Sequence, residues 1–252
     1  MADQEFVGQV AVVTGGSGGL GGHLAKGLAA RGAKVVVNGR NEAAIAAVVD
    51  AIRGAGGEAM AGPADCADPR ALERLRDAVH ERYGPVDLLA AFAGGASTSK
   101  FSLEMGDEEW RYAIGINLDA TFYAIRTFAP DMVAKRSGAI LTMSSLAARQ
   151  ASMAAIGYAA SKGAIISMSR HLAQELGPSQ VRVNCIAPGS VATPHWLASL
   201  APDVQKRLEG LSPLGRLGTE ADITEASLFL LSPRAGWVTG IVFDVAGGRV
   251  MV

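Results

Sequence analysis

Short β-branched runs alternate regularly along the chain with longer segments rich in Ala and Leu that have helical period. Repeated strand–helix–strand units build parallel sheets, with helices packed on both faces. We expect strands at residues 10–14, 35–38, 58–61, 86–91, 139–143, 181–187 and 241–245. Because the alternation runs through the 252 residues, it predicts a single α/β domain over 1–252.

The helices expected between these strands carry start and stop signals. They lie at 20–31, 42–53, 69–83, 107–132, 153–176 and from 221 onward. Asp68 followed by Pro69 is a helix start, because aspartate caps free N–H groups and proline is well tolerated at the first helical position. Between Pro188 and Glu220 the alternation lapses, and a connection of this length indicates a functional lid, at about 190–215.

Charge and cysteine content exclude several classes of function. Lys plus Arg total 23 against 24 Asp plus Glu, a formal net charge of -1, which offers no electrostatic basis for binding nucleic acid. Cys66 and Cys185 have no metal-ligand spacing, so no metal site is expected. There is no signal-like N-terminus and no run of 18 apolar residues, so we expect a soluble, cytoplasmic protein without membrane contact.

A glycine-rich stretch, residues 14–21, joins the first expected strand to the first expected helix. Backbone N–H groups at a helix N-terminus attract anions, and glycines let a ligand approach the backbone closely. The alternative for such a stretch alone is a flexible loop or tight turn, but its place in a strand–loop–helix unit favours a pyrophosphate site. The candidate contacts are Gly15, Ser17, Gly18, Gly19, Leu20 and Gly21.

Tyr158 and Lys162 lie four residues apart in an expected helix, which places the phenol and the ammonium one turn apart on one face. A nearby cation favours the phenolate, so we expect Lys162 to lower the pKa of Tyr158 and make it a proton donor and acceptor near neutral pH. Taken alone, the pair would more often be a packed tyrosine beside an exposed lysine. Its combination with the glycine-rich loop favours a catalytic pair.

These two motifs, in this order, resemble those of the short-chain dehydrogenase/reductase family over essentially the whole chain. The family patterns T-G-x-x-x-G-x-G and Y-x-x-x-K match Thr14, Gly15, Gly19, Gly21, Tyr158 and Lys162. The resemblance implies a doubly wound Rossmann-type sheet with strand order 3-2-1-4-5-6-7 and a ligand at the carboxyl ends of the strands. It also implies hydride transfer between a nicotinamide cofactor and a ketone or secondary alcohol.

The resemblance extends to two further catalytic positions. The family's catalytic serine lies at the end of the fifth strand, thirteen residues before the tyrosine, which is Ser145, with adjacent Ser144 as the alternative. The family's helix asparagine corresponds to Asn117, which alone would be a hydrogen-bonded polar residue inside a helix. The implied roles are that Ser145 binds the carbonyl oxygen, Tyr158 protonates it, Lys162 binds the nicotinamide ribose and Asn117 helps to hold a water.

The segment after the sixth strand also matches the family. Pro188 and Gly189 are followed by Val191 and Thr193, which by resemblance hold the nicotinamide carboxamide. The alternative is that Pro188-Gly189 forms only a turn.

Two shorter matches concern the adenine and the centre of the sheet. Asp65 and Cys66 match the family's adenine-contacting pair, although an Asx-turn at Asp65 is an equal alternative. Ala93 and Gly94 match the second half of the family's N-N-A-G pattern and allow close approach of the cofactor. Both asparagines of that pattern are replaced, by Ala91-Phe92, which puts the polar support of the cofactor in question.

The end of the second strand predicts a preference for NADP(H) over NAD(H). Aligned on the family pattern, Gly39 takes the ribose-facing position, where an acidic residue would favour NAD. Arg40 follows with a guanidinium suited to a 2′-phosphate, and Asn38 and Ser17 would add neutral donors. The alternative is that Arg40 is a solvated charge before the next helix.

Function classes other than an NADP(H)-dependent ketoreductase stay open. One is a dinucleotide-binding regulator without turnover, and another is an NAD-dependent alcohol or sugar dehydrogenase. The family resemblance includes reductases of 3-oxoacyl groups on an acidic carrier, which Lys135-Arg136 would meet. A small ketone, polyol or sugar is an equal alternative. Pocket shape is left to the loops 94–105 and 190–215. Small residues along the helix from 153 predict close helix packing in a homotetramer.

Overall fold

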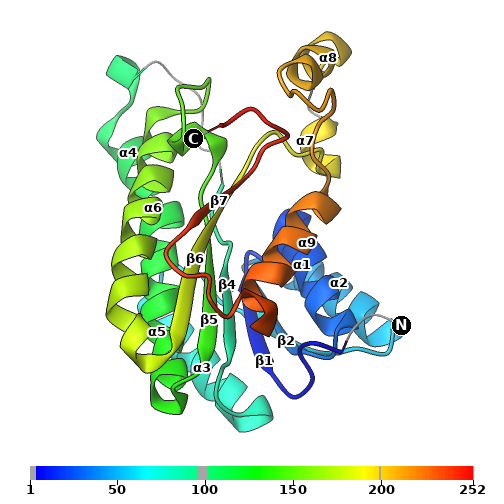
Figure 1. The fold of residues 1–252 in the computed structure, drawn as a ribbon, viewed down its shortest axis with the longest axis vertical. Helices are drawn as coiled ribbons and strands as arrows, with labels where there is room; N and C mark the ends of the chain where they lie inside the picture. The colour runs from blue at the N-terminus through cyan, green and yellow to red at the C-terminus, as the bar shows by residue number, and fades with distance from the viewer. Residues whose placement is uncertain (1–3, 96–101, 199, 252) are drawn as a thin grey trace.

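The centre of the fold is a parallel sheet of seven strands in the order β3-β2-β1-β4-β5-β6-β7 (Figure 1). The structure, a computed structural model, describes residues 4–95, 102–198 and 200–251. The strands are β1 (Val10–Thr14), β2 (Lys34–Gly39), β3 (Glu58–Pro63), β4 (Leu88–Ala91), β5 (Gly138–Met143), β6 (Val181–Pro188) and β7 (Val242–Val245). The expected α/β class and strand order are confirmed.

Helices cover both faces of this sheet, as in a doubly wound fold. α1, α2 and α9 lie on one face, and α3, α4, α5 and α6 lie on the other (Figure 1). The bounds are α1 (Gly19–Ala30), α2 (Glu42–Gly54), α3 (Pro69–Tyr83), α4 (Asp107–Ile114), α5 (Ala120–Lys135), α6 (Ile156–Leu176), α7 (Pro194–Leu197), α8 (Pro202–Gly210) and α9 (Glu220–Leu231). In the described part of the chain, no helix is long and apolar enough to cross a membrane.

Local sequence explains how these elements form and pack. All residues of β1 are buried, because helices cover a central parallel strand on both sides. Leu24 and Leu28 lie one turn apart on α1, and both are fully buried in the core that also contains residues of β1. α3 starts as expected, since the Asp68 side chain accepts a hydrogen bond from the N–H of Arg70 and Pro69 is the first helical residue.

Some expected boundaries were wrong. The strand expected from 86 begins at Leu88, and the carboxylate of Asp87 just before it accepts a hydrogen bond from the N–H of Val10 at 2.8 Å. The helix expected from 153 begins at Ile156, after Ala155 in extended conformation.

The helix expected over 107–132 is interrupted. The structure has α4, then a π-helical turn at Gly115–Asp119, and then α5. Within this turn the Asn117 side chain donates to the carbonyl oxygen of Ala113 and also contacts the backbone of Gly95 after β4. Helices often adopt such a turn where a side chain must be placed at a functional site.

The expected lid, 190–215, contains the short helices α7 and α8, which follow the carboxyl end of β6 and lie beyond the sheet (Figure 1). Residue 199 of this segment lies outside the described residues, as do residues 96–101 of the other loop expected to shape the substrate pocket.

Candidate active site

Most of the expected site residues follow the carboxyl ends of strands. Because the strands are parallel, the carboxyl ends of β1, β2, β4, β5 and β6 meet at one edge of the sheet. The glycine-rich loop, Arg40, Gly94, Ser145 and Gly189 each follow one of these strands. The topology thus brings together segments that are far apart in the sequence, at the edge where open α/β sheets bind ligands.

The glycine-rich loop has no room for side chains at two positions. A Cβ atom on Gly15, whose φ is +65°, would lie 2.8 Å from the carbonyl oxygen of Phe92, and a Cβ on Gly21 would overlap the carbonyl oxygen of Gly15. Gly18, the N-cap residue of α1, makes no side-chain cap. The N–H groups in the first turn of α1 therefore receive no side-chain acceptor from their N-cap, a condition that suits an anionic ligand.

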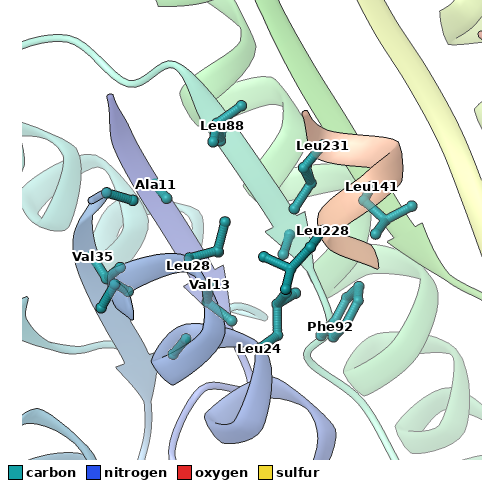
Figure 2. Close-up of a cluster of buried hydrophobic side chains, with 14 of the residues drawn as sticks. Ala11, Val13, Leu24, Leu28, Val35, Leu88, Phe92, Leu141, Leu228 and Leu231 are labelled. Carbon is teal, nitrogen blue, oxygen red and sulfur yellow. The ribbon is translucent and has the colours of Figure 1, made fainter. Parts of the chain in front are cut away.

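The departure from the family's N-N-A-G pattern is absorbed by apolar packing. Phe92 is buried in the core with Leu24 and Leu228 (Figure 2). Polar support comes from Thr14, whose hydroxyl accepts a hydrogen bond from the N–H of Ala93 at 3.0 Å. An aromatic ring and one hydroxyl thus hold the end of β4 without the two asparagines.

Asn117 fastens the backbone after β4. Its side chain is fully buried, its amide donates to the carbonyl oxygens of Ala113 and Gly95, and its Oδ1 accepts from the N–H of Gly95 at 3.1 Å. A Cβ on Gly94, whose φ is +137°, would overlap the Asn117 side-chain oxygen. The water implied by the family resemblance is not needed to satisfy this side chain. Gly95 was not singled out from the sequence, although the Gly94-Gly95 pair was an available signal.

The two candidate serines after β5 have different surroundings. Ser144 is buried, and its hydroxyl donates to the carbonyl oxygen of Lys162 at 2.9 Å. The Ser145 hydroxyl accepts a hydrogen bond from the N–H of Ala147 and lies near the Tyr158 phenol. Ser145 therefore remains the candidate to bind a substrate oxygen, whereas Ser144 joins β5 to α6.

Tyr158 and Lys162 lie on one face of α6, with Lys162 Nζ 5.6 Å from the centre of the Tyr158 ring. Lys162 is buried and donates to the carbonyl oxygen of Met143 at 2.9 Å, which removes the alternative of an exposed lysine. Burial lowers the pKa of Lys162 to about 8.

The expectation that Lys162 lowers the pKa of Tyr158 is not met. Burial raises the pKa of the phenol, and a hydrogen bond with the Ser145 hydroxyl offsets part of that rise. The ammonium is directed to the carbonyl oxygen of Met143 instead of the phenol oxygen, so desolvation decides the sign. Tyr158 is therefore protonated at neutral pH.

Asn38, expected to donate to the cofactor, is used inside the protein. Its side chain is fully buried, and its amide donates to the carbonyl oxygens of Gly62 and Ala64. Its Oδ1 accepts a hydrogen bond from the thiol of Cys66. Burial raises the pKa of this thiol to about 12. Both amide protons of Asn38 are engaged, so this side chain offers no donor to a ligand. Asn38 and Cys66 instead hold β2 to the segment after β3.

Asp65 forms the Asx-turn that the sequence left open, because its Oδ1 accepts from the N–H of Ala67 at 2.9 Å. Its Oδ2 lies 4.0 Å from Nη1 of Arg40, and both side chains are largely exposed. A Cβ on Gly39 would lie 2.9 Å from the hydroxyl oxygen of Ser17. Ser17, Arg40 and Asp65 thus surround the position that the sequence assigns to the ribose.

The segment after β6 is held by the C-terminal part of the chain. A Cβ on Gly189 would lie 2.9 Å from Cα of Ala246, so only glycine fits this approach. Val191 forms an isolated bridge with Gly218, and Thr193 is the N-cap residue of α7. The backbone from 189 to 193 is therefore fixed from two sides, as a ligand-binding segment requires.

Contacts of the C-terminal residues with the lid were not foreseen. Arg249 donates to the Ser190 hydroxyl at 2.9 Å, and the Ser212 hydroxyl donates to the carbonyl oxygen of Gly247 at 2.8 Å. These residues line a hollow of about 100 Å³ beside Gly189. The Gly247-Gly248 pair, both with positive φ, was the available sequence signal.

Lys135 and Arg136, which the sequence offered as a contact for an acidic carrier, come just before β5, whereas Ser145 comes just after it. They therefore lie at the opposite end of the sheet from Ser145. Lys135 donates to the Asp87 carboxylate at 2.6 Å, and Arg136 donates to the carbonyl oxygen of Pro178. A hollow of about 610 Å³ at that end is lined partly by Arg136 and contains none of the candidate site residues. Across the described ranges, no group of three His, Cys, Asp or Glu is placed to hold a metal ion.

Comparison with known proteins identifies the family to which this arrangement belongs. The sequence model of a family described as enoyl-(acyl carrier protein) reductase matches residues 15–249. The 7alpha-hydroxysteroid dehydrogenase of Escherichia coli (strain K12) is 37% identical over 243 residues, which cover 96% of this chain and 94% of that protein. The chain belongs to the short-chain dehydrogenase/reductase family.

Solved structures of short-chain dehydrogenases/reductases match the whole fold. A 3-oxoacyl-[acyl-carrier protein] reductase with bound NAD from Brucella melitensis has a TM-score of 0.92 at 34% identity, covering 100% of this chain and 94% of that chain. A 7 alpha-hydroxysteroid dehydrogenase complexed with NADH and 7-oxo glycochenodeoxycholic acid has a TM-score of 0.93 at 35% identity, covering 100% of this chain and 98% of that chain.

Membership makes this short-chain dehydrogenase/reductase an oxidoreductase that transfers hydride between a nicotinamide cofactor and a ketone or alcohol. The comparisons support the interpretation as an oxidoreductase and not the alternative of a non-catalytic dinucleotide sensor.

Proposed function

We propose that this enzyme is an NADP(H)-preferring ketoreductase in which Tyr158 is the proton donor. The observation that carries the proposal is the grouping of Tyr158, Ser145 and Lys162 at the carboxyl end of β5. The fit for a dinucleotide rests on the glycine-rich loop, which leaves no room for side chains at Gly15 and Gly21. When bound, the cofactor supplies or accepts the hydride.

In reduction, the surroundings of each side chain suit a different task. Tyr158 is protonated at neutral pH because burial raises its pKa, which suits a donor to the substrate oxygen. The Ser145 hydroxyl, beside that phenol, hydrogen-bonds the same oxygen. Lys162, whose ammonium is fixed by the carbonyl oxygen of Met143, binds the nicotinamide ribose. Asn117 keeps the loop at Gly95 in place.

The cofactor preference rests on the end of β2. Gly39 brings no carboxylate against a 2′-phosphate, and the Ser17 hydroxyl occupies the space that a side chain at 39 would enter. Arg40 is exposed and its guanidinium suits bidentate contact with a phosphate.

Asp65 and a 2′-phosphate would compete for Arg40, so the free energies of the two contacts must be compared. An exposed ion pair such as Arg40–Asp65, at 4.0 Å, contributes about 0–1 kcal/mol. A charge-assisted hydrogen bond from Arg40 to phosphate contributes about 1.5–3 kcal/mol. The phosphate contact is the stronger of the two, so Arg40 favours NADP(H).

A second candidate is an NAD(H)-dependent alcohol or sugar dehydrogenase. It is favoured by the carboxylate of Asp65 near the ribose position and by the NAD and NADH in the two similar structures. For either cofactor we propose a ketone or secondary alcohol as substrate, and a panel should cover steroids, 3-oxoacyl thioesters, small ketones, polyols and sugars.

The test follows NADPH and NADH absorbance with this panel, using wild type and Tyr158→Phe. We expect turnover of at least one ketone with NADPH, a lower kcat/KM with NADH, and a roughly hundred- to ten-thousand-fold loss of kcat in the variant. The variant should bind NADPH as tightly as wild type, because it keeps the ring. A Tyr158→Phe enzyme that retains more than about a tenth of wild-type kcat excludes Tyr158 as the proton donor.

We also propose a homotetramer. The edge strand β7 and α6 carry partly exposed apolar side chains, among them Phe243 and Ile156, and symmetric assembly would cover such surfaces. Light scattering at micromolar concentration should give four times the chain mass, and a mass near 26 kDa would exclude any oligomer.

A further inference from the structure

A nearly buried ion pair joins the Ser145 segment to the edge of the sheet. Arg149 follows the short 3-10 helix Leu146–Ala148, which starts directly after Ser145. Its Nε donates to Oδ1 of Asp244 and its Nη2 donates to Oδ2, both at 2.9 Å. The two side chains are 15% and 14% exposed. The contact is therefore bidentate and largely shielded from water.

Such a pair is not explained by stability alone. Taking two charges out of water is unfavourable, and apolar residues in their place are often as stable or more so. What a planar, bidentate contact provides is a defined position and orientation of the two segments it joins.

Each residue of the pair is connected to a segment of the candidate site. On one side, the N–H of Arg149 donates to the carbonyl oxygen of Leu146, and the N–H of Ala148 donates to that of Ser145. Arg149 is thus connected to Ser145 through one tight turn.

On the other side, Asp244 lies in β7, two residues before Ala246. Ala246 lies against Gly189, where the proposed nicotinamide segment begins. In β7 itself, Val245 accepts a hydrogen bond from the N–H of Gly189 at 3.0 Å. The ion pair therefore links the backbone that carries Ser145 to the strand that supports the segment from Gly189.

We propose that Arg149 and Asp244 are positioning residues that hold the Ser145 hydroxyl in place relative to the nicotinamide segment. This inference rests on the proposed function, because it takes Ser145 as the group that binds the carbonyl oxygen. Misplacement of such a donor slows the chemical step. Cofactor affinity should change little, since the glycine-rich loop and Arg40 lie at other strands.

The experiment measures kcat with the fastest ketone of the panel and Kd for NADPH in Arg149→Lys and Asp244→Asn. The first variant keeps the charge without the planar fork, and the second keeps the shape without the charge. We expect kcat to fall about tenfold or more, with Kd within twofold of wild type. The matched control is Arg31→Lys, which alters a contact of Arg31 with both carboxylate oxygens of Glu225, between α1 and α9. The control should leave kcat unchanged.

A Ser145→Ala background distinguishes positioning from general damage. If Arg149 acts through Ser145, Arg149→Lys should lower kcat far less in that background than in wild type. The inference would be overturned if Arg149→Lys lowered kcat by the same factor in wild type and in Ser145→Ala. It would also be overturned by an unchanged kcat or by a matching loss of NADPH affinity. If both single variants fail to fold by circular dichroism, the double variant Arg149→Met/Asp244→Leu, which leaves no unpaired charge, is measured in the same way and judged by the same outcomes. A Ser145→Ala enzyme with full activity would instead refute the proposed role of Ser145, and with it this inference.

Discussion

The Ser144 hydroxyl donates a hydrogen bond to the carbonyl oxygen of Lys162, 2.9 Å away, while the next residue, Ser145, lies beside the Tyr158 phenol. The first serine thereby ties the end of β5 to the helix that carries Tyr158 and Lys162. The second is the residue that we propose to bind the substrate oxygen. On this proposal the two adjacent hydroxyls have different tasks, one structural and one chemical, and the difference can be tested.

Ser144→Ala should lower stability, and Ser145→Ala should lower activity. Loss of the buried Ser144 hydrogen bond is expected to cost about 1–3 kcal/mol, which corresponds to a Tm lower by roughly 2–12 °C. Loss of the Ser145 donor should reduce kcat about a hundred- to a thousand-fold with little change in Tm. Thermal unfolding and steady-state kinetics on both variants check this, and a reversed pattern would make Ser144 the catalytic serine.

Reduction and oxidation should respond to pH in opposite directions. In the proposed mechanism, reduction needs the protonated phenol of Tyr158. Burial raises the pKa of this phenol, so kcat/KM for the ketone should stay level through neutral pH and fall only in alkaline solution. Oxidation of the alcohol needs the phenolate and should rise with pH over the same alkaline range. Profiles of kcat/KM in both directions test this. If kcat/KM for reduction already fell with rising pH in acidic solution, the raised pKa of Tyr158 would be contradicted.

Lys162→Met should alter how stability depends on pH. The pKa of Lys162 is about 8 in the folded protein against an ordinary 10.5, so between these values the unfolded chain binds more protons. Wild-type stability should therefore gain about 3 kcal/mol from this group as pH rises through that window. The variant lacks the gain. Its Tm relative to wild type should thus be lower at pH 10 than at pH 7, and an equal difference at both pH values would argue against a buried ammonium.

Arg40→Ala and Asp65→Asn should shift cofactor preference in opposite directions. Loss of Arg40 should weaken NADPH binding about ten- to a hundred-fold and leave NADH binding nearly unchanged. Asp65→Asn removes the carboxylate near the guanidinium, so the ratio of NADPH to NADH affinity should rise. Dissociation constants for both cofactors on the three proteins measure this. If Arg40→Ala weakens both cofactors equally, Arg40 does not bind the 2′-phosphate.

The class of fold and the segments that form the site could be predicted from local sequence patterns. Alternating strand and helix patterns, the Asp68-Pro69 helix start and the glycines of 14–21 are local signals, and each depends on residues a few positions apart. The family resemblance supplied the strand order and named Ser145 and Tyr158. These expectations needed no knowledge of which side chains meet across the sheet.

Side-chain partners and burial could not be predicted, because they depend on residues that are far apart in the sequence. Asn38 turned inward because Gly62, Ala64 and Cys66 surround it. The shifts of the Tyr158 and Lys162 pKa values follow from desolvation, which no sequence spacing encodes. Arg149 and Asp244 are 95 positions apart and meet only because β5, β6 and β7 are neighbours in the sheet. Local pattern predicts an element, but the packing of remote elements determines each side chain's partners and its access to water.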